Sequence, residues 1–149
     1  MNIRKATTGD IEPLAGLFDQ YRVFYRKEPD PEGCRRFLTE RIKNNESEIF
    51  LAETPEGDAV GFVQLYPLFS STRMKRLWLL NDLYVAPEQR GKGISRLLID
   101  QSKELCRETG ACGLSLETEK TNEIGNNLYP ATGFEVDEDH NYYFWAVTG

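Results

Sequence analysis

Hydrophobic positions in the first third of the chain recur at helical spacing. One such run consists of Leu14, Phe18, Tyr21 and Tyr25. It predicts a helix with one face in the core, and Thr7 and Asp10 precede it at the two positions of an N-terminal capping box. A second helix is predicted with Asp30 as its cap and Pro31 as its first residue. Its inner face would consist of Cys34, Phe37, Leu38, Arg41 and Ile42. Cys34 is therefore interpreted as a core or groove-lining residue.

Elsewhere the pattern consists of short apolar runs between turn residues, which predicts strands. The predicted strands cover residues 3–6, 48–53, 59–66, 77–85, 114–118, 134–136 and 142–147. Two more helices are predicted over residues 91–109 and 122–131, with Gly110 as the left-handed stop of the first. Residues 69–75 are predicted to form a loop. The order β-α-α-β-β-β-α-β-α-β-β predicts one α/β or α+β domain over residues 1–149, with a mixed sheet and helices on both faces.

The composition narrows the class of protein. The chain has 149 residues, with 18 Lys or Arg against 24 Asp or Glu, which gives a net charge of −6. Such a composition is typical of a globular domain and excludes a disordered or collagen-like chain. The acidic balance argues against a nucleic-acid partner, since dedicated nucleic-acid binders usually have a basic face, and it suits a cationic substrate. No apolar run approaches the roughly 18 residues that a membrane span requires, so no membrane partner is expected.

The first residues and the cysteines indicate the cell compartment in which the protein is expected. The first ten residues lack the apolar core of a secretory signal. Cys34, Cys106 and Cys112 are an odd number of cysteines without a framework pattern. Reduced thiols in the cytoplasm are therefore expected.

A predicted strand that runs into a glycine-rich turn has the clearest chemistry. Residues 80–95 read Leu-Asn-Asp-Leu-Tyr-Val-Ala-Pro-Glu-Gln-Arg-Gly-Lys-Gly-Ile-Ser. Backbone amides at such a turn, together with the dipole of the helix that follows, bind phosphate groups. Gly91 and Gly93 would let a ligand approach the backbone closely, and Arg90 and Lys92 add positive charge. The alternative is an ordinary helix cap with basic residues in solvent.

Other phosphate, metal and nucleophile motifs are incomplete or missing from the sequence. The Gly-x-Gly-x-x-Gly fingerprint of dinucleotide-binding folds fails because Arg96 stands at its third glycine position. No Gly-x-x-x-x-Gly-Lys-Ser/Thr, His-Glu-x-x-His or paired Cys-x-x-Cys occurs, so neither a P-loop nor a metal site is expected. The only histidine, His140, lies in an acidic loop, and we interpret it as a solvated turn residue rather than a member of a Ser-His-Asp triad.

Two motifs together resemble the GNAT family of N-acetyltransferases. Residues 90–95 are similar to that family's pyrophosphate loop, Arg/Gln-x-x-Gly-x-Gly/Ala, and depart from it at Ser95. Residues 122–134 are similar to the family's Asn-x-x-Ala-x-x-Leu-Tyr-x-x-x-Gly-Phe, with Gly125 in place of alanine. With the Ala-Thr-x-x-Asp start at residues 6–10, the matches span nearly the whole chain in family order. The first motif further resembles the polyamine, thialysine and Hpa2-type branch of the family.

The resemblance implies a mixed, mostly antiparallel sheet of six to seven strands and acetyl-CoA as co-substrate. The pantetheine arm of acetyl-CoA would add like a strand to the main chain of Leu83, Tyr84 and Val85. Its pyrophosphate would be held by the amides of Arg90, Gly91, Lys92, Gly93, Ile94 and Ser95. Asn122 would bond the co-substrate near its cysteamine end, would cap its own helix, or would do both.

The resemblance also implies catalytic residues. Tyr129 would protonate the leaving CoA thiolate, unless it is only an aromatic packing residue. An amine acceptor has a pKa of ~10.4 and must lose a proton before it attacks the thioester. Some polyamine-type relatives have Glu where this chain has Asn81, which cannot be that base. Asp82 and a water relay remain the candidates, although Asp82 would face the opposite side of a regular strand from Asn81.

The sequence therefore predicts acetyl transfer to a primary amine of a small molecule by direct attack in a ternary complex. Two alternatives stay open: a protein or peptide amine as acceptor, and a non-catalytic acyl-CoA-binding module. The acceptor pocket is expected between the first two helices, residues 69–75 and the last strands. The aromatic residues 142–145 would serve the interface of a homodimer or complete the sheet.

Overall fold

The computed structural model describes residues 1–148. The chain divides into two compact units, of which the first ends at Glu117 and the second begins at Thr118. The expectation of a single domain stays a prediction. In the described part of the chain, no helix is both long enough and apolar enough to span a membrane.

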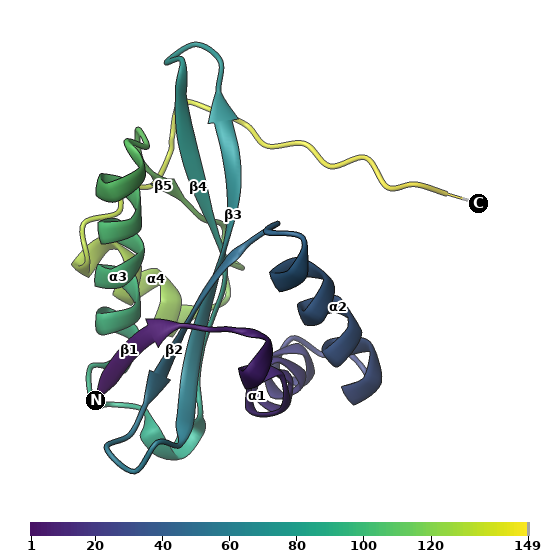
Figure 1. Cartoon of the computed structure of the whole chain (residues 1–149). Helices are drawn as coiled ribbons and strands as arrows, with labels where there is room; N and C mark the ends of the chain where they lie inside the picture. The colour runs from purple at the N-terminus through teal and green to yellow at the C-terminus, as the bar shows by residue number, and fades with distance from the viewer. Residues whose placement is uncertain (149) are drawn as a thin grey trace. The chain divides into compact units, whose positions relative to one another are not determined.

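The first unit is a five-stranded mixed sheet covered by helices on both faces (Figure 1). Its elements are β1 (Asn2–Lys5), the 3-10 turn η1 (Thr8–Asp10), α1 (Ile11–Phe24), α2 (Pro31–Lys43), β2 (Glu48–Glu53), β3 (Ala59–Ser70), β4 (Lys75–Val85), the 3-10 turn η2 (Pro87–Gln89), α3 (Ile94–Thr109) and β5 (Leu114–Ser115). The strands lie in sequence order, antiparallel except for the parallel pair of β4 and β5. Figure 1 shows α1 and α2 on one side of this sheet and α3 on the other.

Short-range side-chain signals start two helical segments: the predicted capping box begins η1, the 3-10 turn that leads into α1, and the predicted cap begins α2. The Thr7 side chain accepts from the amide of Gly9, and the Asp10 carboxylate accepts from the amide of Thr7, which completes the capping box. Asp30 caps α2 by accepting from the amide of Gly33, and Pro31 is the first residue of that helix. These bonds satisfy amides that have no partner within a helix.

The core beneath α1 and α2 is apolar and rich in aromatic rings. Leu14 of α1, Leu38 of α2 and Phe62 of β3 are fully buried in it. The ring of Phe18 lies edge-on to that of Phe62, with 6.1 Å between their centroids. Cys34 also belongs to this core, as predicted.

A β-bulge in β4 changes which of its side chains face which helix. Gln64 pairs with Asp82, but Leu65 pairs with Leu80, so Asn81 is the extra residue. Before the bulge, Trp78 points to α3, where its Nε1 donates to Oγ1 of Thr109 at 2.9 Å. In a regular strand the even-numbered residues 78–84 would all share one face. The bulge therefore separates an α3-facing half of β4 from a half that faces α1.

The predicted strand boundaries need correction at the β3–β4 hairpin and β5. The predicted loop 69–75 is too long at both ends, because β3 continues to Ser70 and β4 starts at Lys75, which leaves only the turn 71–74 between them. The backbone ladder of the hairpin extends to the pair of Ser70 and Lys75, and the guanidinium of Arg76 lies over the ring of its cross-strand neighbour Phe69, 4.9 Å from the centroid. β5 is also shorter than predicted.

The second unit contains α4 (Glu123–Ala131) and the segment that follows it. The predicted strands 134–136 and 142–147 are wrong for the described chain: neither pairs with a strand, and Figure 1 draws both as irregular chain. A strand exists only where a neighbour accepts its amides and donates to its carbonyls. The sheet therefore has five strands rather than six to seven.

Candidate functional site

The turn before α3 leaves a row of backbone amides without acceptors. Gly91 and Gly93 have φ values of +79° and +80°, and a Cβ on either would meet no atom within 4 Å. Leu97 donates its amide to the carbonyl of Gly93 at 3.2 Å. Within residues 1–148, the amides of residues 91–96 donate to no protein acceptor. Consecutive free amides at the start of a long helix favour an anion, and the open space around the two glycines lets one approach.

The two basic side chains of this loop are both held by neighbours. Arg90 donates from Nε to the carbonyl of Val85 at 2.9 Å. Its guanidinium lies 5.7 Å from the ring centroid of Phe24 and 5.5 Å from that of Tyr84. Lys92 donates to the side chain of Gln89 at 2.9 Å. Arg90 thus ties the loop to the end of β4 and adds its charge to the local field, and an anion at this loop would be bonded mainly by the amides.

β4 has an edge that is only partly paired. On one side it pairs with β3 from Lys75 to Val85, but on the other it meets β5 only at Trp78 and Leu79. On that second side, the rest of β4 has no strand neighbour within the described residues, and this stretch includes Leu83, Tyr84 and Val85. An extended ligand can add to such an edge through main-chain hydrogen bonds. The carbonyl of Val85 already accepts from Arg90, so a ligand bond there would be shared.

Asp82 is a buried carboxylate beside the bulge. Its side chain accepts from Nε2 of Gln64 at 2.8 Å and from Nδ2 of Asn81 at 3.1 Å. Burial raises the pKa of Asp82, and hydrogen bonds from Gln64, Asn81 and Tyr21 oppose that rise. The residue is only 5% exposed. A carboxylate with a raised pKa holds a proton more readily, which is a property of a general base.

The expectation that Asn81 and Asp82 face opposite sides was made for a regular strand, and β4 is irregular at this point. The amide group of Asn81 reaches the carboxylate of Asp82, which neighbouring side chains of a regular strand do not do. Asn81 itself is exposed. The two side chains are therefore hydrogen-bonded to each other at the bulge, although one is exposed and the other is buried.

Three residues that the sequence analysis did not name as site residues lie around Asp82. Gln64 is fully buried and accepts from Oγ of Ser47 at 2.9 Å. Tyr21 of α1 donates from its hydroxyl to the carbonyl of Asn81 at 3.3 Å. A neighbouring phenol, Tyr66, has its pKa raised to about 12 by burial and by the charge of Asp82. Gln64 carried a signal in the sequence, since it is the one amide side chain inside the apolar run 59–66.

The second unit holds the other two predicted site residues. Asn122 caps α4 by accepting from the amide of Gly125 at 3.1 Å, and its Nδ2 donates to Oγ1 of Thr118 at 2.9 Å. A Cβ on Gly125 would lie 2.6 Å from that Nδ2, so an alanine at this position would require the Asn122 side chain to move. Tyr129 is half-buried, with its ring edge-on to Phe134 at 5.7 Å between centroids.

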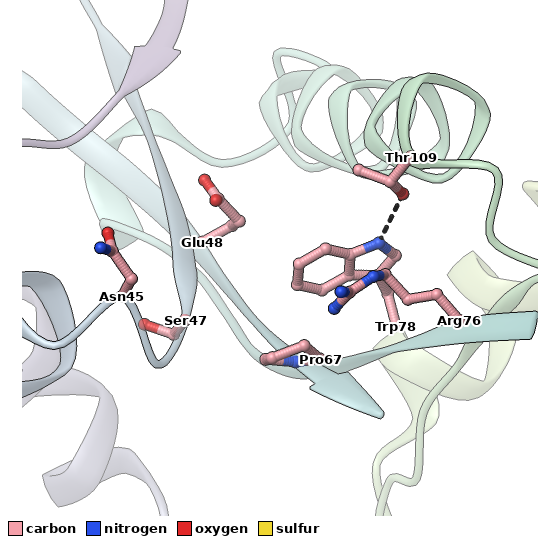
Figure 2. A pocket seen from close by; sticks show the side chains of 7 residues that line it. All are labelled: Asn45, Ser47, Glu48, Pro67, Arg76, Trp78 and Thr109. Atoms are coloured by element: carbon pink, nitrogen blue, oxygen red, sulfur yellow. Dashed lines mark hydrogen bonds between the residues drawn. The ribbon is translucent and has the colours of Figure 1, made fainter. Parts of the chain in front are cut away.

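Two pockets lie in the first unit, away from the loop. One, of about 370 Å³, is lined by residues of α1 and α2 and of the turn between them, among them Arg22, Asp30, Arg36 and Glu40. Figure 2 shows the other, of about 420 Å³, where Glu48 of β2 and Arg76 of β4 line the space beside Trp78. Neither is lined by a residue predicted for catalysis or co-substrate binding. The first of them coincides with part of the region where the acceptor pocket was expected.

The single histidine and the three cysteines are the remaining candidates for metal binding or nucleophilic chemistry. His140 contacts the carboxylate of Asp137 in an exposed turn, with 2.8 Å from Nδ1 to Oδ2, as expected of a turn residue. Cys34 and Cys106 are buried free thiols, and Cys112 is a half-buried one. Burial raises the thiol pKa of Cys34 and of Cys106, which disfavours a nucleophilic thiolate. Within residues 1–148, no three His, Cys, Asp or Glu side chains lie close enough to hold a metal ion.

Comparison with known proteins agrees with this geometry. Residues 14–134 match the model of the acetyltransferase (GNAT) family. The uncharacterized N-acetyltransferase YhfO of Bacillus subtilis is 45% identical over 143 residues, which are 96% of this chain and 95% of YhfO. An aminoglycoside N(6')-acetyltransferase type 1 of Stenotrophomonas maltophilia is 26% identical over 95% of this chain and 90% of its own. A probable acetyltransferase of known crystal structure is 39% identical, with a TM-score of 0.95 over 100% of this chain and 99% of that one. The resemblance inferred from the sequence is thereby confirmed, and the chain belongs to the acetyltransferase (GNAT) family as an N-acetyltransferase.

Proposed function

We propose that the protein transfers the acetyl group of acetyl-CoA to a primary amine of a small molecule. The observation that carries this proposal is the row of free amides at residues 91–96, which follows directly on the unpaired edge of β4. The amides suit a diphosphate and the edge suits an extended amide-bearing chain. Coenzyme A carries those two groups in succession, and its acetyl thioester supplies the activated acyl group.

The acceptor first has to become a neutral amine. Asp82 is 5% exposed, so we propose that it takes the ammonium proton through the hydroxyl of Tyr21 or a water rather than by open contact. Tyr21 is half-buried and bonded to the carbonyl of Asn81, which places its hydroxyl at the bulge. This relay gives a buried base access to a cation that stays near the surface.

The neutral nitrogen then attacks the thioester carbonyl carbon, and the bond from that carbon to sulfur breaks. Tyr129 is the proposed acid, whose phenol hydroxyl gives its proton to the leaving sulfur. The phenolate recovers a proton from the nitrogen that has become an amide. The products are the acetylated amine, the CoA thiol and one proton released to solvent. This sequence needs no covalent enzyme intermediate, in keeping with the raised thiol pKa of Cys34 and Cys106.

A small amine as acceptor is supported by charge and by one relative. The net charge of −6 attracts cations. Asp30 and Glu40 line the α1–α2 pocket, which also carries Arg22 and Arg36 for an acceptor with an acidic group. The relative from Stenotrophomonas maltophilia is named for acetylation of an aminoglycoside, which is a small molecule with several amines. The three free thiols suit the reducing cytoplasm as the place of action.

Thiol release from acetyl-CoA tests the activity with a panel of polyamines, amino acids, aminoglycosides and peptides. Release that depends on a small amine is expected. Release with peptides alone would overturn the small-molecule acceptor, and binding of acetyl-CoA without release by any amine would make the protein a non-catalytic module. Tyr129→Phe should keep acetyl-CoA affinity but slow a single turnover, while Tyr143→Phe, which removes an exposed phenol hydroxyl, should change neither.

The pH profile tests Asp82 separately. Asp82→Asn should lower kcat/KM near neutral pH, because the acceptor then has no base. The loss should shrink as the pH approaches the acceptor's own pKa of ~10.4, where the amine is neutral without help. A defect of equal size at every pH would indicate a structural role instead.

A further inference from the structure

An arginine on the wall of the pocket beside Trp78 has no partner for its charge. This Trp78 pocket, of about 420 Å³, is lined by Asn45, Ser47, Glu48, Pro67, Arg76, Trp78 and Thr109 (Figure 2). Arg76 is half-buried, and its guanidinium makes no hydrogen bond or ion pair within residues 1–148. A guanidinium has five donors, and removing them from water without acceptors is costly. Arg76 is therefore suited to bind an anionic group from outside the chain.

Two aromatic rings hold this guanidinium in place. Its carbon lies 4.9 Å from the ring centroid of Phe69 and 5.5 Å from that of Trp78. Trp78 is fixed in turn by the 2.9 Å bond from its Nε1 to Oγ1 of Thr109. An arginine that is already held by rings loses little freedom when it binds, and its planar donors match the two oxygens of a carboxylate.

A carboxylate lines the same pocket. Figure 2 shows the side chains of Glu48 and Arg76 around one space, Glu48 from β2 and Arg76 from β4. Glu48 pairs with Nζ of Lys5 at 3.0 Å, but the Lys5 side chain is 60% exposed. Because such an exposed ion pair is weak, Glu48 can also accept from a cation in the pocket. Its negative charge disfavours a highly charged phosphate, so one wall suits a carboxylate and another suits an ammonium.

We propose that the Trp78 pocket binds a small zwitterion, an α-amino acid, whose carboxylate bonds to Arg76 and whose ammonium bonds to Glu48. The volume of the pocket lies within the range of about 300–1,000 Å³ that is usual for small-molecule sites. Ser47 and Asn45 also line the pocket and offer a hydroxyl and an amide to the same ligand.

The Trp78 pocket is distinct from the site of acetyl transfer. Trp78 lies on the half of β4 that faces α3, whereas Asp82 lies on the half that faces α1. Thr109 is the last residue of α3, and the glycine loop precedes its first residue. A helix of 16 residues is about 24 Å long, so the helix separates the pocket from the loop by that length. The zwitterion is therefore an effector and not the acceptor.

Two hydrogen bonds connect the wall of the pocket to Asp82. Oγ of Ser47 donates to Oε1 of Gln64 at 2.9 Å, and Nε2 of Gln64 donates to Asp82 at 2.8 Å. A ligand oxygen that accepts from the Ser47 hydroxyl competes with Gln64 and loosens the amide that orients Asp82. An amino acid in the pocket should therefore lower kcat/KM for the acceptor. The binding site itself is independent of the proposed function, but this effect on the rate rests on it.

Isothermal titration calorimetry without acetyl-CoA tests the binding. Among the standard L-amino acids, at least one should bind to the wild-type chain. Its methyl ester lacks the carboxylate and its N-acetyl derivative lacks the ammonium, so each should bind about tenfold more weakly or worse. These ligands probe the unchanged protein, whether or not a variant folds. Absence of binding by every amino acid, or equal binding of the methyl ester, would overturn the proposal.

Charge-removing variants with matched controls identify the two walls. Arg76→Gln should weaken binding of the amino acid about 10–100-fold, because it removes a charged pair of hydrogen bonds. Arg73→Gln, in the exposed turn of the same hairpin, should have no effect. Glu48→Gln should also weaken binding, whereas Glu56→Gln, in the exposed turn between β2 and β3, should not. Binding that is unchanged by both Arg76→Gln and Glu48→Gln contradicts the assignment.

Tryptophan fluorescence places the ligand. The chain has two tryptophans, and Trp145 is 80% exposed, so Trp145→Phe leaves Trp78 as the only indole. The emission of Trp78 should change with the same Kd that calorimetry gives. Binding that leaves this emission unchanged would put the amino acid elsewhere, such as the α1–α2 pocket, and would overturn the proposal.

Thiol release in the presence of an amine acceptor tests the effector role. The bound amino acid should lower kcat/KM of the wild-type chain and leave that of Arg76→Gln unchanged, whereas competition at the acceptor site would affect both. Binding at Trp78 with no change in rate overturns the connection to Asp82. If no amine at all gives thiol release, the proposed function fails, while the calorimetric and fluorescence results for the pocket still stand or fall by themselves.

Discussion

Replacing Gly93 by alanine tests whether the amides before α3 hold the diphosphate of acetyl-CoA. Gly93 has a φ of +80° and a ψ of +11°, a conformation that costs a residue with a Cβ about 1–2 kcal/mol. Because no atom lies within 4 Å of the new Cβ, this cost is conformational and not steric. The free protein can relieve it by turning the loop, but the bound protein cannot, since the amides must converge on the ligand. Acetyl-CoA should therefore bind about 5–30-fold more weakly.

Gly57 provides a matched control. It has a φ of +90°, it also has no atom within 4 Å of an added Cβ, and it lies in the turn between β2 and β3. Gly57→Ala should lower the melting temperature by about 2–4 °C per kcal/mol and leave the affinity for acetyl-CoA unchanged. Isothermal titration calorimetry gives the affinities and thermal unfolding gives the stabilities. If Gly93→Ala binds acetyl-CoA as tightly as wild type, the amides do not hold the diphosphate and the reasoning fails.

Two further predictions concern the stability of the protein. Gly61→Ala should destabilise the protein by about 1–3 kcal/mol, because the added Cβ would lie 2.9 Å from the backbone oxygen of Tyr84. Gly16→Ala is the control: it has open space in α1 and should stabilise the protein by about 0.8–1 kcal/mol. Urea unfolding measures both changes. Asp82→Asn should remove a pH dependence of stability. Burial raises the folded-state pKa of Asp82 above the unfolded value, so wild type loses stability as the pH rises from the unfolded pKa through the folded one. The stability of the variant relative to wild type should accordingly increase with pH over this window, and a constant or falling difference would contradict the raised pKa.

Features that depend on residues a few positions apart could be predicted from the sequence. The capping box of Thr7 and Asp10 and the cap of Asp30 involve neighbours three residues apart, and the structure has them as expected. The glycine loop belongs to the same class, because the positive φ values of Gly91 and Gly93 are a local property of the chain. Such features need no knowledge of what the segment packs against.

Features that depend on register and on distant partners could not be predicted. The bulge at Asn81 follows from how β4 is aligned with β3, and it lets Trp78 reach Thr109 on α3. No pattern within β4 alone contains that alignment. Segment 142–147 is the opposite case, since its composition indicates a strand but its pairing depends on an edge elsewhere. The sequence pattern was sufficient to predict that the segment favours a strand, and insufficient to predict whether it pairs with another strand.

The surroundings of Asp82 bear most directly on the proposed chemistry. A buried carboxylate is normally paired with a cation, because removing its charge from water without compensation is costly. Here the neighbours that bond it, Gln64 and Asn81, are neutral amides, and within residues 1–148 no ion pair includes Asp82. Packing alone would favour a leucine at this position, as in the rest of the apolar strand. Asp82 therefore lies in the protein without a cation, and Tyr21 links its surroundings toward the surface. Such a carboxylate suits a substrate that is positively charged when it binds, as a primary amine is near neutral pH.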